Sequence, residues 1–239
     1  MTESSSNLLK SRRFLPLFIT QFLGAMNDNL MKQALIVMIT FGLLQSSDIS
    51  PQILVTMAAG IFILPFFLFS ATAGQMADKF EKSTAIRRIK IAEILIMGIA
   101  VAGFYLSNTY FLIVVLFMMG TQSAFFGPLK YGILPSHLAE NELIGGNALI
   151  EGGTFLAILI GTIAGGLLIV ANQGITIVSA TLLAVALLGW LASRSIPVAA
   201  AADPELKINA NIFQETWRMV ARARETRSVF LSIMGISWF

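Results

Sequence analysis

An aspartate and a lysine lie inside an apolar run that is too long to be anything but a membrane helix. The run extends from Phe14 to about Leu44. A helix rises about 1.5 Å per residue, so Asp28 would lie roughly 21 Å from its start, near the middle of a hydrocarbon core about 30 Å thick. Lys32 follows one turn later on the same face, in the favourable acid-to-base order. Charges at this depth usually mark a pathway or a site; the alternative is a self-neutralising pair that merely faces a neighbouring helix.

The composition is typical of a membrane-embedded chain. Of the 239 residues, 56% are hydrophobic and only 12% are charged, against about 25% charged in soluble domains. The chain has no cysteine and a single histidine, His137, so no disulfide framework or thiolate metal site is available and we expect no metal and no cofactor. A net charge of +3 could suggest nucleic acid, but the basic residues are sorted by membrane side, so no nucleic-acid partner is expected.

Six apolar segments are long enough to cross a bilayer as helices. They are predicted at about residues 14–44, 53–77, 89–106, 110–134, 147–171 and 175–192. The first is not a signal peptide, because the apolar region of a signal peptide spans only about 7 to 15 residues before its cleavage site. The sequence therefore predicts an all-α membrane protein in which residues 1–193 form a unit of six transmembrane helices.

The loops between these segments alternate in charge. Those near residues 45–51, 107–109 and 172–174 contain no Lys or Arg. Basic residues gather instead before residue 14, in the segment 79–90, at Lys130, and after residue 193. The positive-inside rule then places both ends of the six-helix unit, and hence the N-terminus, in the cytoplasm.

The chain changes character after the sixth segment. Residues 194–228 are predicted to be a cytoplasmic central linker with an amphipathic helix. One helical face is apolar and the rest is basic: Phe213, Trp217 and Val220 against Arg218, Arg222 and Arg224. This pattern is typical of a helix lying on the anionic inner leaflet; a solvated loop helix is the alternative. Residues 229–239 are apolar but too short to span, so we expect a truncated seventh helix and a longer parent protein.

The loop between the second and third segments resembles a motif of the major facilitator superfamily. It reads Gly74-Gln75-Met76-Ala77-Asp78-Lys79-Phe80-Glu81-Lys82, close to G-x-x-x-D-[RK]-x-G-[RK], with Glu81 at the place of the second glycine. The resemblance implies a latch that holds one conformational state. A merely solvated loop is the alternative. We assign conformational roles to Gly74, Asp78, Lys79, Lys82, Arg87 and Arg88.

Two patterns concern the packing of the segments. Small residues recur every fourth position in the fifth segment, which lets another helix backbone approach closely: Gly153, Ala157, Gly161 and Gly165. Gln21 and Gln122 each follow a threonine in the first helix of a three-helix set. That agrees with a 3+3 inverted repeat, in which binding sites lie at the midplane.

Three longer segments, in order along the chain, resemble the lysophospholipid transporter family. They include the stretches Gly24-Ala25-Met26-Asn27-Asp28-Asn29, Phe126-Gly127-Pro128-Leu129-Lys130-Tyr131-Gly132 and Asn147-Ala148-Leu149-Ile150-Glu151-Gly152-Gly153-Thr154. The resemblance covers all six segments. It implies the N-terminal six-helix half of a major facilitator fold, with the 3+3 inverted repeat.

That family resemblance also implies an activity. Its members flip lysophospholipids, chiefly 2-acyl-glycerophosphoethanolamine, from the outer to the inner leaflet of the bacterial inner membrane for reacylation. The expected partners are then the lysophospholipid substrate, membrane lipids and the C-terminal half of the transporter. Some members are fused to an acyltransferase and an acyl-carrier-protein ligase, so an acyltransferase in the same or another chain is a further candidate partner. The chain itself is not expected to be an enzyme, and any such activity would lie beyond residue 239.

A hypothesis for the substrate site follows from the headgroup. Lysophosphatidylethanolamine carries an ammonium and a phosphate, and Asp28 and Lys32 offer the opposite charges about 5 to 6 Å apart on one helix face. Asp28 would receive the ammonium and Lys32 the phosphate. Nearby amide side chains would contact the glycerol: Gln21, Asn27, Asn29 and Gln122.

A second hypothesis concerns a cytoplasmic gate. Asp78, Glu93, Lys130 and Glu151 all fall near the predicted inner ends of their helices. We expect them to form an ion-pair network that closes the inner side in the outward-open state. Because buried pairs can cost more in desolvation than they return, the network is assigned to switching rather than to stability.

Two other functions remain as alternatives. One is a facilitator for another small molecule, such as a drug or a sugar. The other is an acyltransferase enzyme, for which residues 137–142 are the only candidate. Acyltransferases of this pathway use H-x-x-x-x-D, whereas here His137 is followed by Glu142 in a short loop.

Overall fold

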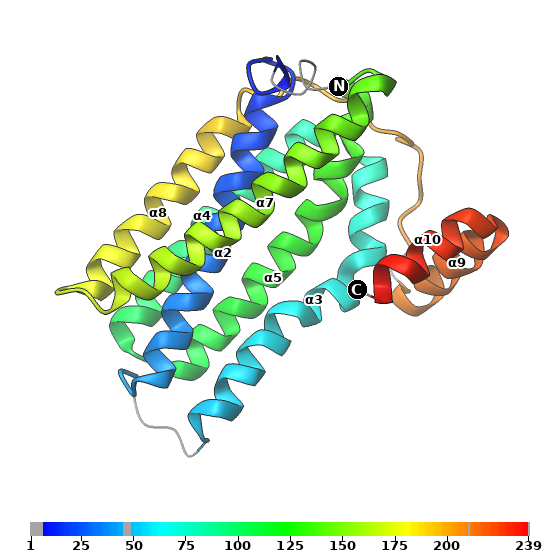
Figure 1. Cartoon of the computed structure of the whole chain (residues 1–239). Helices are drawn as coiled ribbons and strands as arrows, with labels where there is room; N and C mark the ends of the chain where they lie inside the picture. The colour runs from blue at the N-terminus through cyan, green and yellow to red at the C-terminus, as the bar shows by residue number, and fades with distance from the viewer. Residues whose placement is uncertain (1–6, 45–48, 210, 239) are drawn as a thin grey trace.

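The computed structural model describes residues 7–44, 49–209 and 211–238. Within these residues the regular structure is helical, and Figure 1 shows a bundle of long helices. The six long helices are α2 (Leu15–Thr40), α3 (Pro51–Lys79), α4 (Lys82–Leu106), α5 (Thr109–Gly132), α7 (Glu140–Ile169) and α8 (Gly174–Ser193). Three shorter ones are α6 (Leu134–His137), α9 (Ile212–Glu225) and α10 (Arg227–Trp238).

Two helices begin about two turns earlier than the apolar patterns predicted. α4 starts at Lys82 rather than near residue 89, and α7 starts at Glu140 rather than near residue 147. Both extensions are polar, so hydropathy alone missed them, and both are capped by a carboxylate. Glu81 accepts hydrogen bonds from the first turn of α4, and Glu142 accepts one from Ala139 N at 2.9 Å. Of the predicted loop at residues 45–51, positions 45–48 lie outside the described residues.

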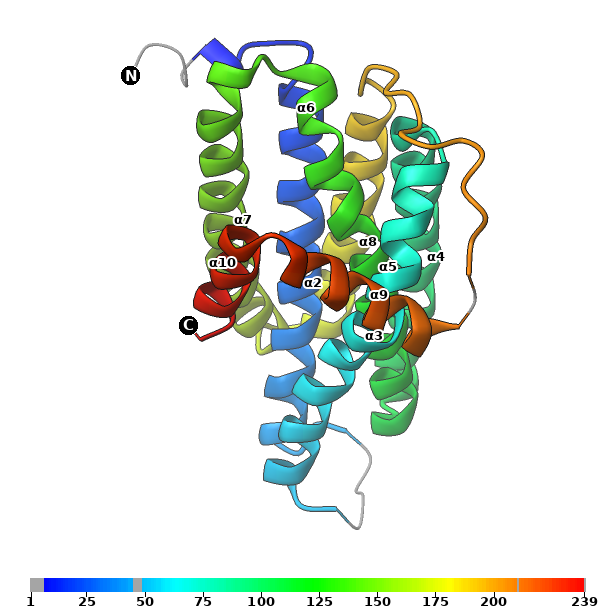
Figure 2. The ribbon, with the colours of Figure 1, turned by 90° about the vertical axis from the view of Figure 1, so that its right-hand side faces the viewer.

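Five helical segments of the described chain are long and apolar enough to cross a membrane. They are Pro51–Lys79, Lys82–Leu106, Thr109–His137, Glu140–Ile169 and Gly174–Ser193. α2, which the sequence analysis counted as the first span, is not among them because polar residues interrupt it. It lies inside the bundle, packed against α3, α5, α7 and α8, so protein rather than lipid covers much of its surface (Figure 2). The chain is an all-α membrane protein.

The first three long helices and the last three pack against each other through matching contacts. α2 packs mainly on α7, α5 packs mainly on α3, and α4 packs on α8 (Figure 1). Each set thus places its first helix against the second helix of the other set, as a 3+3 arrangement requires. Both crossings use a glycine. A Cβ at Gly161 of α7 would collide with the Met26 carbonyl of α2, and one at Gly120 of α5 would collide with the Phe62 carbonyl of α3.

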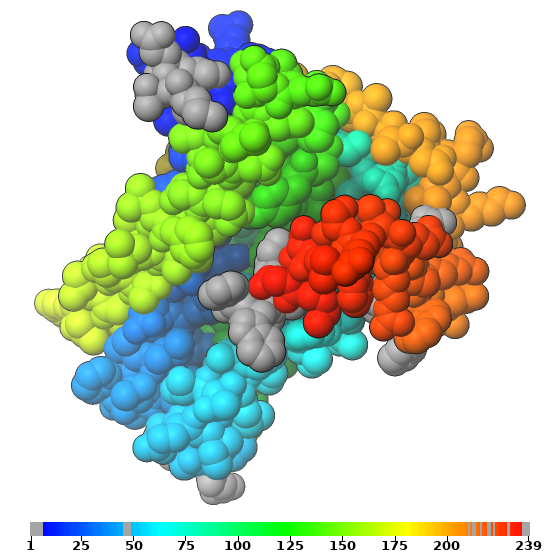
Figure 3. Space-filling view, turned by 45° about the vertical axis from the view of Figure 1, so that its right-hand side comes forward, coloured from blue at the N-terminus to red at the C-terminus, as the bar shows by residue number. Residues whose placement is uncertain are grey.

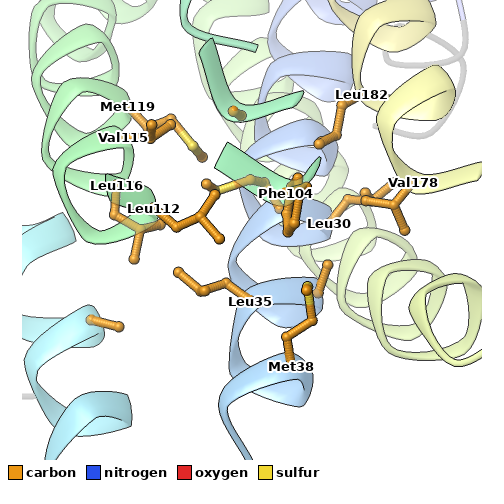
Figure 4. Close-up of a cluster of buried hydrophobic side chains, with 14 of the residues drawn as sticks. Leu30, Leu35, Met38, Phe104, Leu112, Val115, Leu116, Met119, Val178 and Leu182 are labelled. Carbon is orange, nitrogen blue, oxygen red and sulfur yellow. The ribbon is translucent and has the colours of Figure 1, made fainter. Parts of the chain in front are cut away.

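The bundle interior has two apolar clusters with a polar layer between them. Figure 4 shows the larger cluster, in which side chains of α2, α4, α5 and α8 meet around Leu35, Phe104 and Leu112. The smaller cluster lies towards the other end of these helices and contains Phe14 and Leu134. Buried polar side chains occupy the helix segments in between: Thr20, Gln21, Asn27, Asp28, Lys90, Glu93 and Gln122.

The C-terminal helices lie on the outside of this bundle. α9 packs against α3 and α10, and Figure 3 shows both short helices on the surface. Residues 212–225 form a helix within the predicted linker, and Trp217 is exposed. The side chains of Phe213, Val220 and Arg222 lie outside what the structure describes. Contact of this helix with lipid headgroups, like the truncated seventh helix, stays a prediction.

The crossing of α2 and α7 yields a stability test. Gly161→Leu should push the two helices apart, because overpacking a tight contact costs about 1–3 kcal/mol or more. We expect a marked loss of monodisperse protein after detergent extraction, measured by size-exclusion chromatography. Gly152→Leu is the matched control, since Gly152 is exposed on the same helix with no atom within 4 Å of an added Cβ. Equal yields from the two variants would contradict the close packing.

Candidate functional site

The centre of the polar layer is an ion pair within α4. Lys90 Nζ lies 2.5 Å from Glu93 Oε2, and the two side chains are 1% and 2% exposed. The i, i+3 spacing places both on one helix face. Two more side chains complete the coordination of this carboxylate: Asn27 Nδ2 donates to Glu93 Oε1 and Gln122 Nε2 donates to Glu93 Oε2, each at 3.3 Å. α2, α4 and α5 therefore meet at Glu93.

The neighbouring helices leave room for the Lys90 ammonium. A Cβ at Gly24 of α2 would collide with Lys90 Nζ, and a Cβ at Gly189 of α8 would lie 3.8 Å from it. The Phe126 ring centroid is 5.2 Å from Nζ, within reach of a cation–π attraction. Gly24, which the sequence analysis noted only as part of a family segment, is thus the position that admits this cation.

Ser123 lies between Asp28 and the residues that surround the ion pair. Ser123 Oγ lies 2.6 Å from Asp28 Oδ2 and 3.1 Å from Gln122 Oε1. A hydroxyl has one proton, so Ser123 can donate to only one of these oxygens at a time. Gln122 in turn donates to Glu93. Ser123 was not predicted, because a serine in an apolar segment has no sequence signal that separates it from ordinary helix packing.

Asp28 lines an open cavity of about 360 Å³ that is bounded by α2, α3, α4, α5 and α7. Its lining is mixed, with the aromatic rings of Phe62 and Phe66 and the amide of Gln122. Three lysines also line it: Lys32, Lys90 and Lys130. Because Glu93 neutralises Lys90, the cavity presents one carboxylate and two further ammonium groups to a ligand.

Asp28 and Lys32 do not form a pair. Among the described residues the ion pairs within 4.0 Å do not include either side chain. Lys32 Nζ instead lies 4.2 Å from the Phe62 ring centroid, on α3. The two groups interact electrostatically without direct contact, and both line the cavity.

The predicted amide contacts fall into two groups. Asn29 and Gln122 line the cavity. Asn27 is fully buried and bonded to Glu93, so it supports the ion pair rather than facing a ligand. Gln21 lines the cavity too, but it bonds to α7, donating to the Ile150 carbonyl at 3.3 Å and accepting from Thr154 Oγ1 at 2.9 Å.

Of the four predicted gate residues, the structure brings Lys130 and Glu151 within electrostatic reach of each other, but it does not show all four as one network. Glu93 pairs with Lys90. The sequence analysis had counted Lys90 among the basic residues of the loop, because it placed the start of this helix near residue 89 rather than at Lys82. Lys130 Nζ lies 4.7 Å from the Tyr131 ring centroid, and the Tyr131 hydroxyl donates to Glu151. Asp78 is exposed at the end of α3. The i, i+3 spacing of Lys90 and Glu93 is the sequence signal that could have identified Lys90 as the partner of Glu93.

The facilitator-type loop is attached to the chain that follows α8. Lys82 Nζ donates to the Ala200 carbonyl and Arg87 donates to the Ile196 carbonyl, each at 3.1 Å. The Asp78 carbonyl accepts from Asp203 N at 2.9 Å. These bonds hold the α3–α4 turn and the predicted linker together at one end of the bundle.

Glu81 replaces a glycine of the motif without strain. Its φ of −59° needs no glycine, and its carboxylate accepts from Ser83 N, Thr84 N and Ala199 N. Burial alone would raise the pKa of Glu81, but hydrogen bonds from Thr84, Ala199 and Ser83 outweigh burial and lower this pKa to about 2. The residue thus caps α4 and ties it to the linker in its charged form.

Residues 137–142, the candidate for an enzyme site, make hydrogen bonds that hold two parts of the chain together. Glu142 accepts a hydrogen bond from Arg13 at 2.6 Å in addition to capping α7 through Ala139 N. The Arg13 guanidinium also donates to the His137 carbonyl at 3.0 Å. The segment 137–142 therefore joins the tail before α2 to the start of α7.

Comparison with known proteins assigns this arrangement to a class. Residues 17–239 match the Major Facilitator Superfamily, and the chain belongs to that superfamily. It is therefore a multi-pass membrane protein of the transporter class.

Within the superfamily the chain is similar to proteins named lysophospholipid transporter LplT. It is 32% identical to that of Salmonella enteritidis over 244 residues, which cover 100% of this chain and 53% of the relative. It is 31% identical to that of Cronobacter sakazakii over 167 residues, which cover 70% of this chain and 39% of the relative. The chain spans about half the length of the first of these relatives and less of the second.

The buried ion pair predicts a specific pattern of stability. Lys90→Met should destabilise the fold by about 3–5 kcal/mol, because it leaves the Glu93 carboxylate buried without a cation. Adding Glu93→Gln should recover much of the loss, since no buried charge remains and the amide oxygen can still accept from Asn27 or Gln122. The unfolding temperature in detergent measures both. A double variant no more stable than Lys90→Met would show that the pair is not the source of the effect.

Glu81 predicts a pH-dependent contribution. Its pKa in the folded protein, about 2, lies below its ordinary value of 4.5, so its stabilisation is present above that ordinary value and is lost as the pH falls towards 2. Glu81→Gln should therefore lower the unfolding temperature at about pH 7, and its difference from the wild type should shrink at about pH 3. Glu205→Gln, at an exposed linker carboxylate, is the control. A difference that does not change with pH would refute the charged cap.

Proposed function

We propose that this chain forms the N-terminal half of a transporter that moves lysophospholipids, chiefly 2-acyl-glycerophosphoethanolamine, from the outer to the inner leaflet of the bacterial inner membrane. The single observation that carries the proposal is the Asp28 carboxylate, which faces a cavity and has the Ser123 hydroxyl, but no cation within 4.0 Å in the described chain, as its partner. The names of the similar proteins support it. The N-terminus is then cytoplasmic, as the distribution of basic residues indicates.

The charges of the cavity match a zwitterionic headgroup. Asp28 receives the ammonium, because the nearby Lys90 is already neutralised by Glu93. The phosphate lies against Lys32, with Lys130 as a second ammonium on the same lining. Charged hydrogen bonds of this kind contribute about 1.5–3 kcal/mol each.

The size of the cavity fits the headgroup rather than the whole lipid. A volume of about 360 Å³ lies at the lower end of the range of about 300–1,000 Å³ found for small-ligand pockets. The acyl chain needs no polar partner, so it leaves the cavity along apolar walls such as Phe62 and Phe66. The C-terminal half of the transporter would complete the site, and a reacylating acyltransferase would consume the product.

The test compares two headgroups. Asp28→Asn should reduce flipping of lysophosphatidylethanolamine roughly tenfold or more, since one charged hydrogen bond is weakened. It should affect lysophosphatidylglycerol less, because that headgroup has no cation. Flipping in spheroplasts measures both, with insertion checked by membrane fractionation. Asp203→Asn, an exposed carboxylate of the linker, is the matched control.

Two outcomes would count against the proposal. An Asp28→Asn protein that is normally inserted and fully active on the ethanolamine lipid would show that Asp28 does not bind the ammonium. A wild-type protein that flips neither lysophospholipid, with the complete transporter present, would refute the substrate class itself.

A further inference from the structure

A second and larger cavity lies on the outer side of the same bundle. Its volume is about 830 Å³, and it runs between α3 and α4 with α5 as its floor. α3 and α4 both pack on α5, and the three helices can be followed in Figure 2. Most of the lining is apolar, including Met76, Ala92, Ile96, Phe117 and Phe125. This groove is distinct from the cavity around Asp28, although Gln122 borders both.

Two aromatic contacts shape the α3 and α5 walls of the groove. The Phe69 ring of α3 lies 6.0 Å from the Phe125 ring and 6.4 Å from the Phe117 ring of α5, between centroids. The α4 wall of the groove includes Ala85, Ile89, Ala92 and Ile96. Apart from Arg88 and Thr84, the part of α4 that lines the groove is therefore apolar.

In its half nearer the start of α4, the groove carries a cation that has no partner within the described residues. Arg88 lines the groove and is exposed, and its guanidinium has no hydrogen bond or ion pair within the described residues. The neighbouring cations are engaged elsewhere, Lys82 on the Ala200 carbonyl and Arg87 on the Ile196 carbonyl. Glu81 also borders this half, but its carboxylate accepts hydrogen bonds from α4 and the linker.

We propose that this groove binds one anionic phospholipid of the cytoplasmic leaflet. The phosphate lies on the Arg88 guanidinium, which is suited to bidentate phosphate binding, and one acyl chain extends along α4 from Arg88 to Ile96. These two residues are about 12 Å apart along the helix axis. An apolar groove in a membrane-spanning chain favours hydrocarbon over water, and the half with the cation is the half that the distribution of basic residues places at the anionic leaflet. The inference does not depend on the transported substrate.

The headgroup part is tested with Arg88→Gln. We expect about tenfold weaker binding of phosphatidylglycerol to the purified full-length protein in nanodiscs, measured by native mass spectrometry of retained lipid. Arg12→Gln is the matched control, because Arg12 is an exposed cation of the same membrane side that does not line the groove. Equal retention by Arg88→Gln and Arg12→Gln would overturn the assignment of the phosphate.

The acyl-chain part is tested separately with Ala92→Phe, which fills the groove. We expect loss of the retained lipid with Arg88 intact, whereas Ala102→Phe, at an exposed position of α4 outside the groove, should retain it. Soluble glycerol 3-phosphate should not displace the lipid. Displacement by that compound, or full retention by Ala92→Phe, would show that Arg88 binds a free phosphate or a headgroup alone and would overturn the groove as a lipid site.

Discussion

The burial of the Lys90–Glu93 ion pair sets the arrangement of the surrounding bundle. Removing two charges from water costs several kcal/mol per ion, and the loss is offset only where the geometry is good and the remaining polar atoms are hydrogen-bonded. Asn27 and Gln122 supply those hydrogen bonds from α2 and α5. Gly24 supplies the space, since any side chain there would meet the ammonium. Three helices are therefore held in register by one carboxylate.

This internal neutralisation separates the charges that hold the helices together from the charges that line the cavity. Lys90 and Glu93 neutralise each other, so the pair does not need Asp28 or Lys32 as a counter-ion. Both of these side chains can therefore line the cavity. Ser123 lies within hydrogen-bond distance of both Asp28 and Gln122, and Gln122 is already held by Glu93. A site of this kind is pre-organised, because its walls are fixed by contacts that do not involve the ligand.

The α3–α4 turn shows how a family motif can depart from its pattern and keep its shape. Glu81 stands where the motif has glycine, and its backbone remains in the extended region while its carboxylate caps α4 and binds the linker. That capping uses one acidic side chain and leaves Arg88 as an available cation beside an apolar groove. This end of the bundle therefore combines a turn held by several hydrogen bonds with an apolar groove that has an arginine in its wall.

Local pattern was enough to identify the helices and the superfamily, because apolar runs and motif segments are read from neighbouring residues. It also indicated Asp28 and Gln122 as candidate site residues, because polar side chains are uncommon in apolar segments of this length. The tertiary structure alone decided that Lys90 is buried, that its partner is Glu93, and that Lys32 lies on Phe62 instead of on Asp28. The reason is physical: hydropathy ends a helix where charges begin, whereas α4 continues to Lys82, and which side chain a charge meets depends on helices that are distant in sequence.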